Sequence, residues 1–418
     1  MLSKTIFGLL LCVVALTPVP YGTVEPWWKA VFVCAVFGIT ILAVLDSAIR
    51  ASVRLNPWSV LLPLLALTTL AYLQSWTRIS ADSFQTRFFA LQLLALTAFL
   101  ALLYRYAATT NRLRLLVYVV IGIATASAIF GTLRLTTQHE TGFLLPLLKP
   151  NLGFAQFVNR NHFAYLMEMA FGLIVGIVIA ERSRQNLVYL AFLSPLWVAL
   201  VLSSSRGGLL AMLTQVVIAA LLLVRWASLR IALAAVLVAG VVAGTLWVGG
   251  DRLATNFGSS GTEPTIVTTP TRENASRNEI WRATLKLFAA HPLLGTGLGA
   301  YWIGITAYHD ASGVLVPQEA HNDYLELLAS GGLIGLAIGV WFAVAVIRLA
   351  KRNLAASTGF VRALRLGAIL GIAGVGVHSL FDFGLHLLGN AVVFLTLIMM
   401  ATAQIDSRKV VDLNLQHQ

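Results

Sequence analysis

Apolar residues in this chain are gathered into long blocks of Leu, Val, Ala and Ile, and several blocks are long enough to cross a bilayer, which takes roughly 20 residues. The ten-residue segments of alternating hydrophobicity that mark a membrane β-barrel are not seen. The pattern therefore predicts an all-α polytopic integral membrane protein with about 12 transmembrane helices. The apolar blocks cover residues 5–21, 27–48, 58–75, 86–107, 113–135, 162–181, 186–202, 207–224, 229–249, 326–348, 360–380 and 386–404.

The first block has some features of a secretory signal, because Lys4 precedes an apolar run. No clear small-x-small cleavage site follows it, and another apolar block begins at once. We therefore interpret the first block as a membrane span.

Composition supports the membrane assignment. Hydrophobic residues make up 58% of the 418 positions and charged residues 11%, whereas a soluble domain carries roughly 25% charged residues. This excludes an ordinary soluble enzyme, a disordered tail and a coiled coil. Both cysteines, Cys12 and Cys34, lie inside apolar blocks and indicate neither a disulfide framework nor a metal site.

The net charge of +12 is unevenly distributed between the connections. With the N-terminus in the cytoplasm, the cytoplasmic connections hold 17 of the 29 lysines and arginines and four acids, and the outer connections hold 12 basic residues and 13 acids. This is a strong positive-inside bias. It explains the basic charge without nucleic acid as a partner, and it predicts that both termini are cytoplasmic.

The lengths of the connections divide the chain into four parts. Residues 1–135 hold the first five transmembrane helices, and residues 136–249 hold an outer loop followed by helices six to nine. Residues 250–325 form a large outer loop that carries candidate functional residues, and residues 326–418 hold helices ten to twelve and a short cytoplasmic tail. Long loops usually carry function or are disordered.

The large loop contains a segment that reads as a helix on the membrane surface. Ser276 and Glu279 have the spacing of a capping box, and an apolar stripe at helical spacing follows at Trp281, Leu285 and Phe288. We therefore expect a helix over residues 277–290. The preceding stretch, 258–271, is rich in Gly, Ser, Thr and Pro and is expected to be mobile.

Three outer arginine positions can bind an anion. Arg206 follows three serines and precedes two glycines, so it sits where a capped helix begins and where another group can approach the backbone closely. Arg277 shares a face with Trp281, which directs Arg277 toward the spans and Arg282 elsewhere. Arg160 opens the sixth span, with Asn161 as a plausible cap. The alternative is that these arginines only anchor the protein at lipid headgroups.

The segment from Ala320 to Glu326 supplies a candidate base. His321, Tyr324 and Leu325 fall on one face at helical spacing, and a histidine beside carboxylates can remove a proton from an alcohol. The alternative is a helix cap around Asn322 with an interfacial histidine. Glu326 at the mouth of a span needs a partner, and we expect an arginine.

Three further polar residues, His378, Asp382 and His386, are four apart between the last two spans. We interpret them as a structural hydrogen-bond cluster rather than a metal site, because a divalent ion needs more well-placed ligands. The glycines at 295, 297 and 299 follow a helix, so they are not a dinucleotide fingerprint, and no Walker A sequence occurs. No cofactor and no metal are expected.

Several of these motifs together resemble the O-antigen ligase and polymerase superfamily over residues 150–390. The resemblance rests on Ser-Arg-Gly-Gly at 205–208, on Arg277 with Trp281 followed by His-Pro-Leu-Leu-Gly-x-Gly-x-Gly at 291–299, and on Ala-His-Asn-Asp-Tyr-Leu-Glu at 320–326 with Gly332-x-x-Gly335. The stretch Asn-Arg-Asn-His-Phe at 159–163, which includes His162, and the stretch from His378 to Phe383 are similar to many surface-polysaccharide members.

The resemblance implies an all-helical membrane glycosyltransferase in the bacterial inner membrane with a periplasmic active site. It implies transfer of a glycan from undecaprenyl diphosphate to lipid A–core, with a ligase favoured over a polymerase or a protein O-oligosaccharyltransferase. The implied partners are the undecaprenyl-diphosphate-linked glycan, lipid A–core and membrane lipids.

The resemblance also implies residue roles. His321 would be the base, and Arg206 and Arg277 would bind the diphosphate. Substrate-positioning candidates of second rank are Arg160, His162, Arg282, Tyr324 and Glu326. Two rival classes are an isoprenoid-linked glycan carrier, which needs a polar path through the membrane, and a non-catalytic scaffold.

Overall fold

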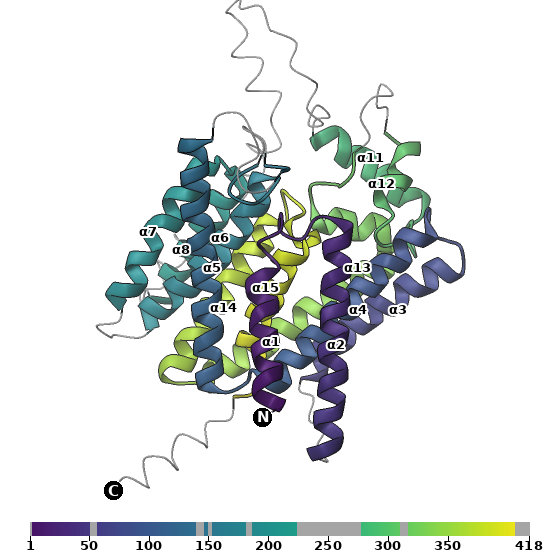
Figure 1. Cartoon of the computed structure of the whole chain (residues 1–418). Helices are drawn as coiled ribbons and strands as arrows, with labels where there is room; N and C mark the ends of the chain where they lie inside the picture. The colour runs from purple at the N-terminus through teal and green to yellow at the C-terminus, as the bar shows by residue number, and fades with distance from the viewer. Residues whose placement is uncertain are drawn as a thin grey trace, which may run out of the picture.

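The computed structural model describes residues 2–50, 57–138, 146–148, 153–180, 186–223, 277–309 and 317–405, and these contain thirteen α-helices (Figure 1). The first eight are α1 (Leu2–Leu16), α2 (Pro26–Arg50), α3 (Trp58–Trp76), α4 (Ser83–Tyr106), α5 (Thr110–Thr137), α6 (Arg160–Ala180), α7 (Asn186–Ser203) and α8 (Arg206–Leu223). The others are α11 (Arg277–Ala290), α12 (Tyr301–Gly304), α13 (Asp323–Ala355), α14 (Gly359–His378) and α15 (Leu388–Thr402), with short 3₁₀ helices η1 (Ile305–Ala307) and η2 (Gly384–His386).

Seven of the described helices are long and apolar enough to span a membrane, namely α2 to α6, α13 and α14. Four shorter apolar helices, α1, α7, α8 and α15, lie among them. The chain is therefore an all-helical polytopic membrane protein. Eleven of the twelve predicted spans coincide with a helix, and the twelfth, at 229–249, lies outside the described residues.

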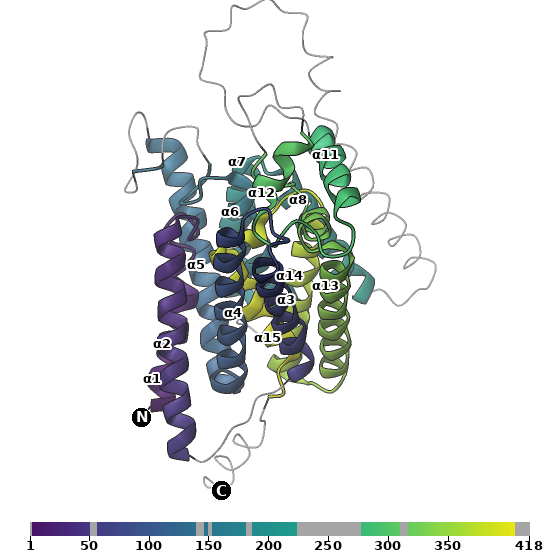
Figure 2. The same cartoon turned by 90° about the vertical axis from the view of Figure 1, so that its right-hand side faces the viewer.

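The long helices run in broadly the same direction and form one bundle (Figure 2). The helices α11 and α12 lie at one end of this bundle, and the N-terminal end of α1 lies at the other (Figure 1). This arrangement agrees with the predicted placement of residues 277–307 and the N-terminus on opposite sides of the membrane. The orientation in the cell remains a prediction.

The closest helix packing in the bundle is between α6 and α14. Two glycines four apart on α6, Gly172 and Gly176, face two glycines four apart on α14, Gly371 and Gly367. A methyl group at Gly172, Gly176 or Gly367 would overlap the backbone of the opposite helix, and one at Gly371 would overlap the side chain of Leu397. Small residues at this spacing let membrane helices approach until their backbones touch. The contact fixes the start of α6 against the end of α14, where the candidate site lies.

A kink divides α13 into a short first part and a long span. Gly332 has φ +65° inside the helix, a conformation that only glycine adopts readily. The glycine turn at 295–299 packs into this kink, and Gln74 of α3 holds the two together. The Gln74 Nε2 donates to the carbonyl oxygens of Leu294 and Ser330 at 2.5 and 2.8 Å.

The predicted helix over residues 277–290 is confirmed as α11. Its buried side chains are Ile280, Ala283, Thr284 and Leu287, whereas Leu285 is exposed. The predicted apolar stripe through Trp281, Leu285 and Phe288 is therefore rotated by part of a turn from the face that is buried. The buried face of α11 is set by its packing on α13 and η1. The proposed cap Ser276 and the stretch 258–271 lie outside the described residues.

Replacing Gly176 with leucine should separate α6 from α14. The added side chain would overlap the backbone at Gly367, and such overpacking costs about 1–3 kcal/mol or more. We expect a lower thermal unfolding midpoint for purified Gly176→Leu. The matched control is Gly122→Leu on α5, where nothing lies within 4 Å; equal midpoints for the two variants would contradict this packing.

Candidate functional site

Three predicted arginines meet at one small cavity of about 110 Å³, which we call the arginine pocket. Arg160, Arg206 and Arg277 all line it, although successive members are 46 and 71 residues apart in the chain. Guanidinium groups bind phosphate through paired donors. The arginine pocket is therefore suited to an anion with several phosphate oxygens. Its other lining residues are Asn161, Ser204, Gly207, His378 and Phe381.

Each of the three arginines is the first residue of a helix: α6, α8 or α11. The first backbone N–H groups of a helix lack internal partners and carry partial positive charge. Ser205 caps α8 as expected, since its Oγ accepts a hydrogen bond from Gly208 N at 3.3 Å. Three helix N-termini thus add to the positive field of the arginines in the arginine pocket.

The cap of α6 differs from the sequence-based prediction. Asn159 caps this helix, and its Oδ1 accepts from the backbone N–H of Asn161 at 2.8 Å. The Asn161 side chain is released to bridge two other elements. Its Nδ2 donates to Asp382 Oδ2, and its Oδ1 accepts from Ser205 Oγ at 2.9 Å. Asn161 therefore ties the start of α8 to the segment that follows α14.

Asp382 is a buried carboxylate at the junction of these elements, with 1% of its side chain exposed. Its Oδ1 lies 3.5 Å from His321 Nδ1 and accepts from the backbone N–H of Phe383 at 2.9 Å. Burial by itself would raise the pKa of the Asp382 carboxyl, but the contact with His321 and the nearby His162 and Arg277 lower that pKa below its usual range. Asp382 is therefore ionised at neutral pH.

His321 lies on a loop that is held from three directions. Its backbone φ is +50°, which places the residue before α13 rather than within it, so the predicted common face with Tyr324 is wrong. Ala320 on one side accepts from Trp281 Nε1 at 3.0 Å. Asn322 on the other side caps α13 and donates to the carbonyl oxygen of Leu380 at 3.0 Å. These contacts direct the imidazole toward Asp382.

His378 also lines the arginine pocket, a position that the sequence did not predict. The ring is fully buried, stacks on Tyr165 at 4.1 Å and places Nδ1 2.9 Å from Glu168 Oε2. Its Nε2 has no hydrogen-bond partner. A methyl group at Gly207 would lie 2.6 Å from that nitrogen, so only glycine leaves Nε2 open to the pocket.

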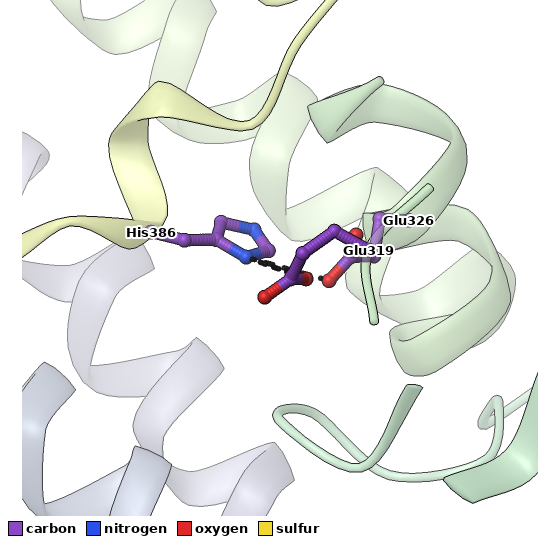
Figure 3. A group of neighbouring side chains, drawn as sticks. All are labelled: Glu319, Glu326 and His386. Carbon is purple, nitrogen blue, oxygen red and sulfur yellow. Dashed lines mark hydrogen bonds and ion pairs between the residues drawn. The ribbon is translucent and has the colours of Figure 1, made fainter. Parts of the chain in front are cut away.

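A second group of ionisable residues lies near His321, around His386 (Figure 3). His386 Nδ1 is 3.1 Å from Glu319 Oε2 and 3.4 Å from Glu326 Oε1, and Nε2 is 3.4 Å from Asp323 Oδ1. The residues predicted as one hydrogen-bond cluster, His378, Asp382 and His386, therefore each pair with different carboxylates or imidazoles.

Glu319, Glu326 and His386 could hold a metal ion, because one ligand atom of each lies within 4.8 Å of the others. Burial alone would lower the pKa of His386, but Glu326 and Glu319 raise it well above its usual value. His386 conversely lowers the pKa of Glu319 against the opposing effect of burial. A metal ligand must be the neutral imidazole, so an ion here would have to displace the proton that the carboxylates favour on His386.

The remaining sequence candidates are dispersed. The side chain of Arg282 is exposed and lies outside the lining of the arginine pocket, and the Tyr324 hydroxyl donates to the carbonyl oxygen of Gly376 at 2.7 Å. His162 is buried against the Phe383 ring at 4.7 Å. Glu326 accepts from Ala320 N at 2.9 Å, and its expected arginine partner is not found in the part of the chain that the structure describes.

A family model described as O-Antigen ligase matches residues 190–340. Residues 190–340 carry an O-antigen ligase family domain. No curated protein matches the chain. The matched stretch includes Arg206, Arg277 and His321, and it confirms the resemblance inferred from the sequence over that range. The domain indicates a membrane glycosyltransferase of the O-antigen ligase and polymerase family that acts on lipid-linked glycans.

The raised pKa of His386 has a consequence for stability. A protonated imidazole among carboxylates stabilises the fold fully below the unfolded-state pKa of about 6.5, and this stabilisation is lost as pH rises through the higher folded-state pKa. We expect His386→Gln to lower the thermal midpoint at pH 6 by at least about 2 °C, which corresponds to roughly 1 kcal/mol. The difference should shrink above pH 8; a difference independent of pH would contradict the assignment.

Proposed function

We propose that this O-antigen ligase family protein is an O-antigen ligase, an inverting glycosyltransferase that moves a glycan from undecaprenyl diphosphate to a hydroxyl of lipid A–core on the periplasmic face of the inner membrane. The observation that carries the proposal is the arginine pocket at three helix N-termini, joined through Asn161 and Asp382 to His321. The pocket suits the diphosphate of the donor, and the histidine suits an acceptor hydroxyl.

The arginine pocket stabilises the leaving group. When the bond between the anomeric carbon and the phosphate oxygen breaks, negative charge accumulates on the diphosphate. Fixed donors that already point at this position stabilise the transition state more than the bound donor. Arg160, Arg206 and Arg277 supply these donors as guanidinium groups that line one small cavity.

His321 accepts the proton of the acceptor. Its Nδ1 faces the ionised Asp382, which leaves Nε2 as the basic nitrogen. The acceptor oxygen forms a bond to the anomeric carbon while the carbon–phosphate-oxygen bond breaks. The hydroxyl proton passes to Nε2, and undecaprenyl diphosphate departs with the electron pair. Attack opposite the leaving group inverts the anomeric configuration.

The proposed reaction uses no cofactor. Negative charge develops on the diphosphate, and the arginines stabilise this charge in place of the divalent ion that other transferases use. The four sequence parts keep their proposed roles: residues 250–325 contribute Arg277 and His321, whereas residues 136–249 contribute Arg160 and Arg206.

Two relatives of this reaction differ in the acceptor. A polymerase would use a second lipid-linked repeat unit, and a protein O-oligosaccharyltransferase would use a Ser or Thr hydroxyl. A carrier would need polar groups along a path through the membrane. Glu168 is an ionisable residue within a span, but it pairs with His378 beside the arginine pocket and thus belongs to the site.

A transfer assay tests the proposal. Purified protein, an undecaprenyl-diphosphate glycan and lipid A–core are mixed without nucleotide and with EDTA. We expect the lipid A band to shift upward. Lengthening of the donor glycan with bare lipid A would identify a polymerase, and no product with several donors and acceptors would remove the transferase assignment.

Arg277 and Arg282 differ in position by slightly more than one helical turn, so they form a matched pair. Arg277→Gln should lower kcat about 10²- to 10³-fold, the effect of removing one fixed donor to a developing oxyanion. Arg282→Gln should retain transfer within about twofold, since its side chain is exposed outside the arginine pocket. The rates are compared in the same transfer assay at equal amounts of folded protein, and the reverse result would exchange the two roles.

His321→Ala should lower kcat about 10²- to 10⁴-fold, the contribution of a positioned base. Asp382→Asn should also lower kcat, because it removes the charge that orients His321 and stabilises its protonated form. The control is binding of undecaprenyl diphosphate, which should persist in His321→Ala. Unchanged transfer by His321→Ala would remove the base assignment.

A further inference from the structure

A second and larger cavity, of about 640 Å³, lies beside the His386 group and has no role in the reaction described above. We call it the aromatic cavity. It is bounded by α2, α3, α4, the segment from Leu298 to Trp302, the start of α13 and His386. Its aromatic lining residues are Trp27, Phe84, Phe88, Phe89, Tyr301 and Trp302.

The aromatic cavity and the arginine pocket differ in charge. Glu319, Asp323 and Glu326 line the aromatic cavity together with the basic groups Lys29 and His386, and His386 lies within 3.4 Å of a carboxylate oxygen of each of the three acids. The arginine pocket carries three guanidinium groups. A diphosphate is therefore attracted to the arginine pocket rather than to the aromatic cavity. The second cavity suits a ligand that offers hydrogen-bond donors and no phosphate at the point of contact.

Polar groups in the wall of the aromatic cavity have unused hydrogen-bonding capacity. The Ser330 hydroxyl lacks a hydrogen-bond partner although the residue is 97% buried, with 3% of its surface exposed. The Oδ2 atom of Asp323 also lacks a hydrogen-bond partner, whereas its Oδ1 lies 3.4 Å from His386 Nε2. Buried polar groups are normally paired, so these atoms are candidates to bind the hydroxyls of a ligand.

The aromatic side chains supply the complementary apolar surface. Trp27, Phe84 and Trp302 are 55%, 73% and 42% exposed, so their rings are available at the edge of the cavity. An apolar lining with a few convergent polar groups is typical of a small-ligand site. Flat rings beside carboxylates match the surface of a sugar, which has apolar C–H faces and hydroxyl edges.

The ring of Phe383 links the His386 group to His321. Its centroid lies 4.9 Å from that of His321 and 6.0 Å from that of His386, and His386 lines the aromatic cavity. A ligand that contacts His386 in the aromatic cavity would therefore bind one aromatic ring away from the proposed base.

We propose that the aromatic cavity is the acceptor site, where the carboxylates of Glu319, Asp323 and Glu326 accept hydrogen bonds from an uncharged sugar and the aromatic rings stack on its apolar face. The inference rests on the proposed function, because it names where the acceptor of that reaction binds. Glu326 thereby binds the acceptor, whereas its sequence motif predicted only a general positioning role.

Kinetics with two single variants test the acceptor site. Glu319→Gln removes one acceptor of hydrogen bonds, and Trp302→Ala removes one ring. Glu319→Gln should raise KM for lipid A–core about tenfold, the loss expected for one hydrogen bond to a charged group, and Trp302→Ala should raise the same KM through the loss of apolar contact area. Both should leave KM for the undecaprenyl-diphosphate donor within about twofold. The control is Trp76→Ala, an exposed ring at the end of α3 outside both cavities, which should change neither KM.

A binding measurement separates this inference from the proposed reaction. Deacylated core oligosaccharide is titrated calorimetrically into the protein in a detergent without a sugar headgroup. We expect binding to the wild type that is weakened about tenfold in Glu319→Gln. If the wild type transfers glycan but both variants keep the wild-type KM for lipid A–core, the acceptor site is wrong and the reaction stands. If the oligosaccharide binds as expected but no glycan is transferred, the reaction is wrong and the sugar site stands.

Discussion

The buried charge of Asp382 is the constraint on which the candidate site depends. A carboxylate with 1% of its side chain exposed is stable only if positive or hydrogen-bonding groups surround it. Asn161 from α6, His321 from the loop before α13 and the field of Arg277 from α11 meet this need together. The same requirement that stabilises one anion therefore brings together the proposed base and Arg277, one of the arginines proposed to bind phosphate. An apolar residue at position 382 would remove the interactions that hold these three elements together.

Most of the fold could be predicted from hydropathy, because a span is encoded locally by its own residues. Eleven predicted spans coincide with helices, and the capping-box spacing gave α11. Contacts between helices were not predictable in the same way. The approach of α6 to α14 depends on glycines almost two hundred residues apart, and the buried face of α11 depends on the position of α13, so neither follows from the periodicity of one segment.

Only some residues of the candidate site could be selected from the sequence. Arg206, Arg277 and His321 could be selected because polar residues in an apolar sequence need an explanation. The role of His378 could not, since it depends on Glu168 from another helix and on the missing side chain of Gly207. The arginine partner expected for Glu326 was inferred from charge alone. In the structure, His386 and the backbone N–H of Ala320 contact the Glu326 carboxylate instead.

The order of the site's parts along the chain has a consequence for biosynthesis. Arg160 and Arg206 are made first, Arg277 and His321 follow, and His378 and Asp382 come close to the C-terminal end. Under the proposed roles, a nascent chain that has not yet inserted α14 and the segment after it holds the arginines but lacks the anion that faces the proposed base. We expect such an intermediate to bind a lipid diphosphate without catalysing transfer.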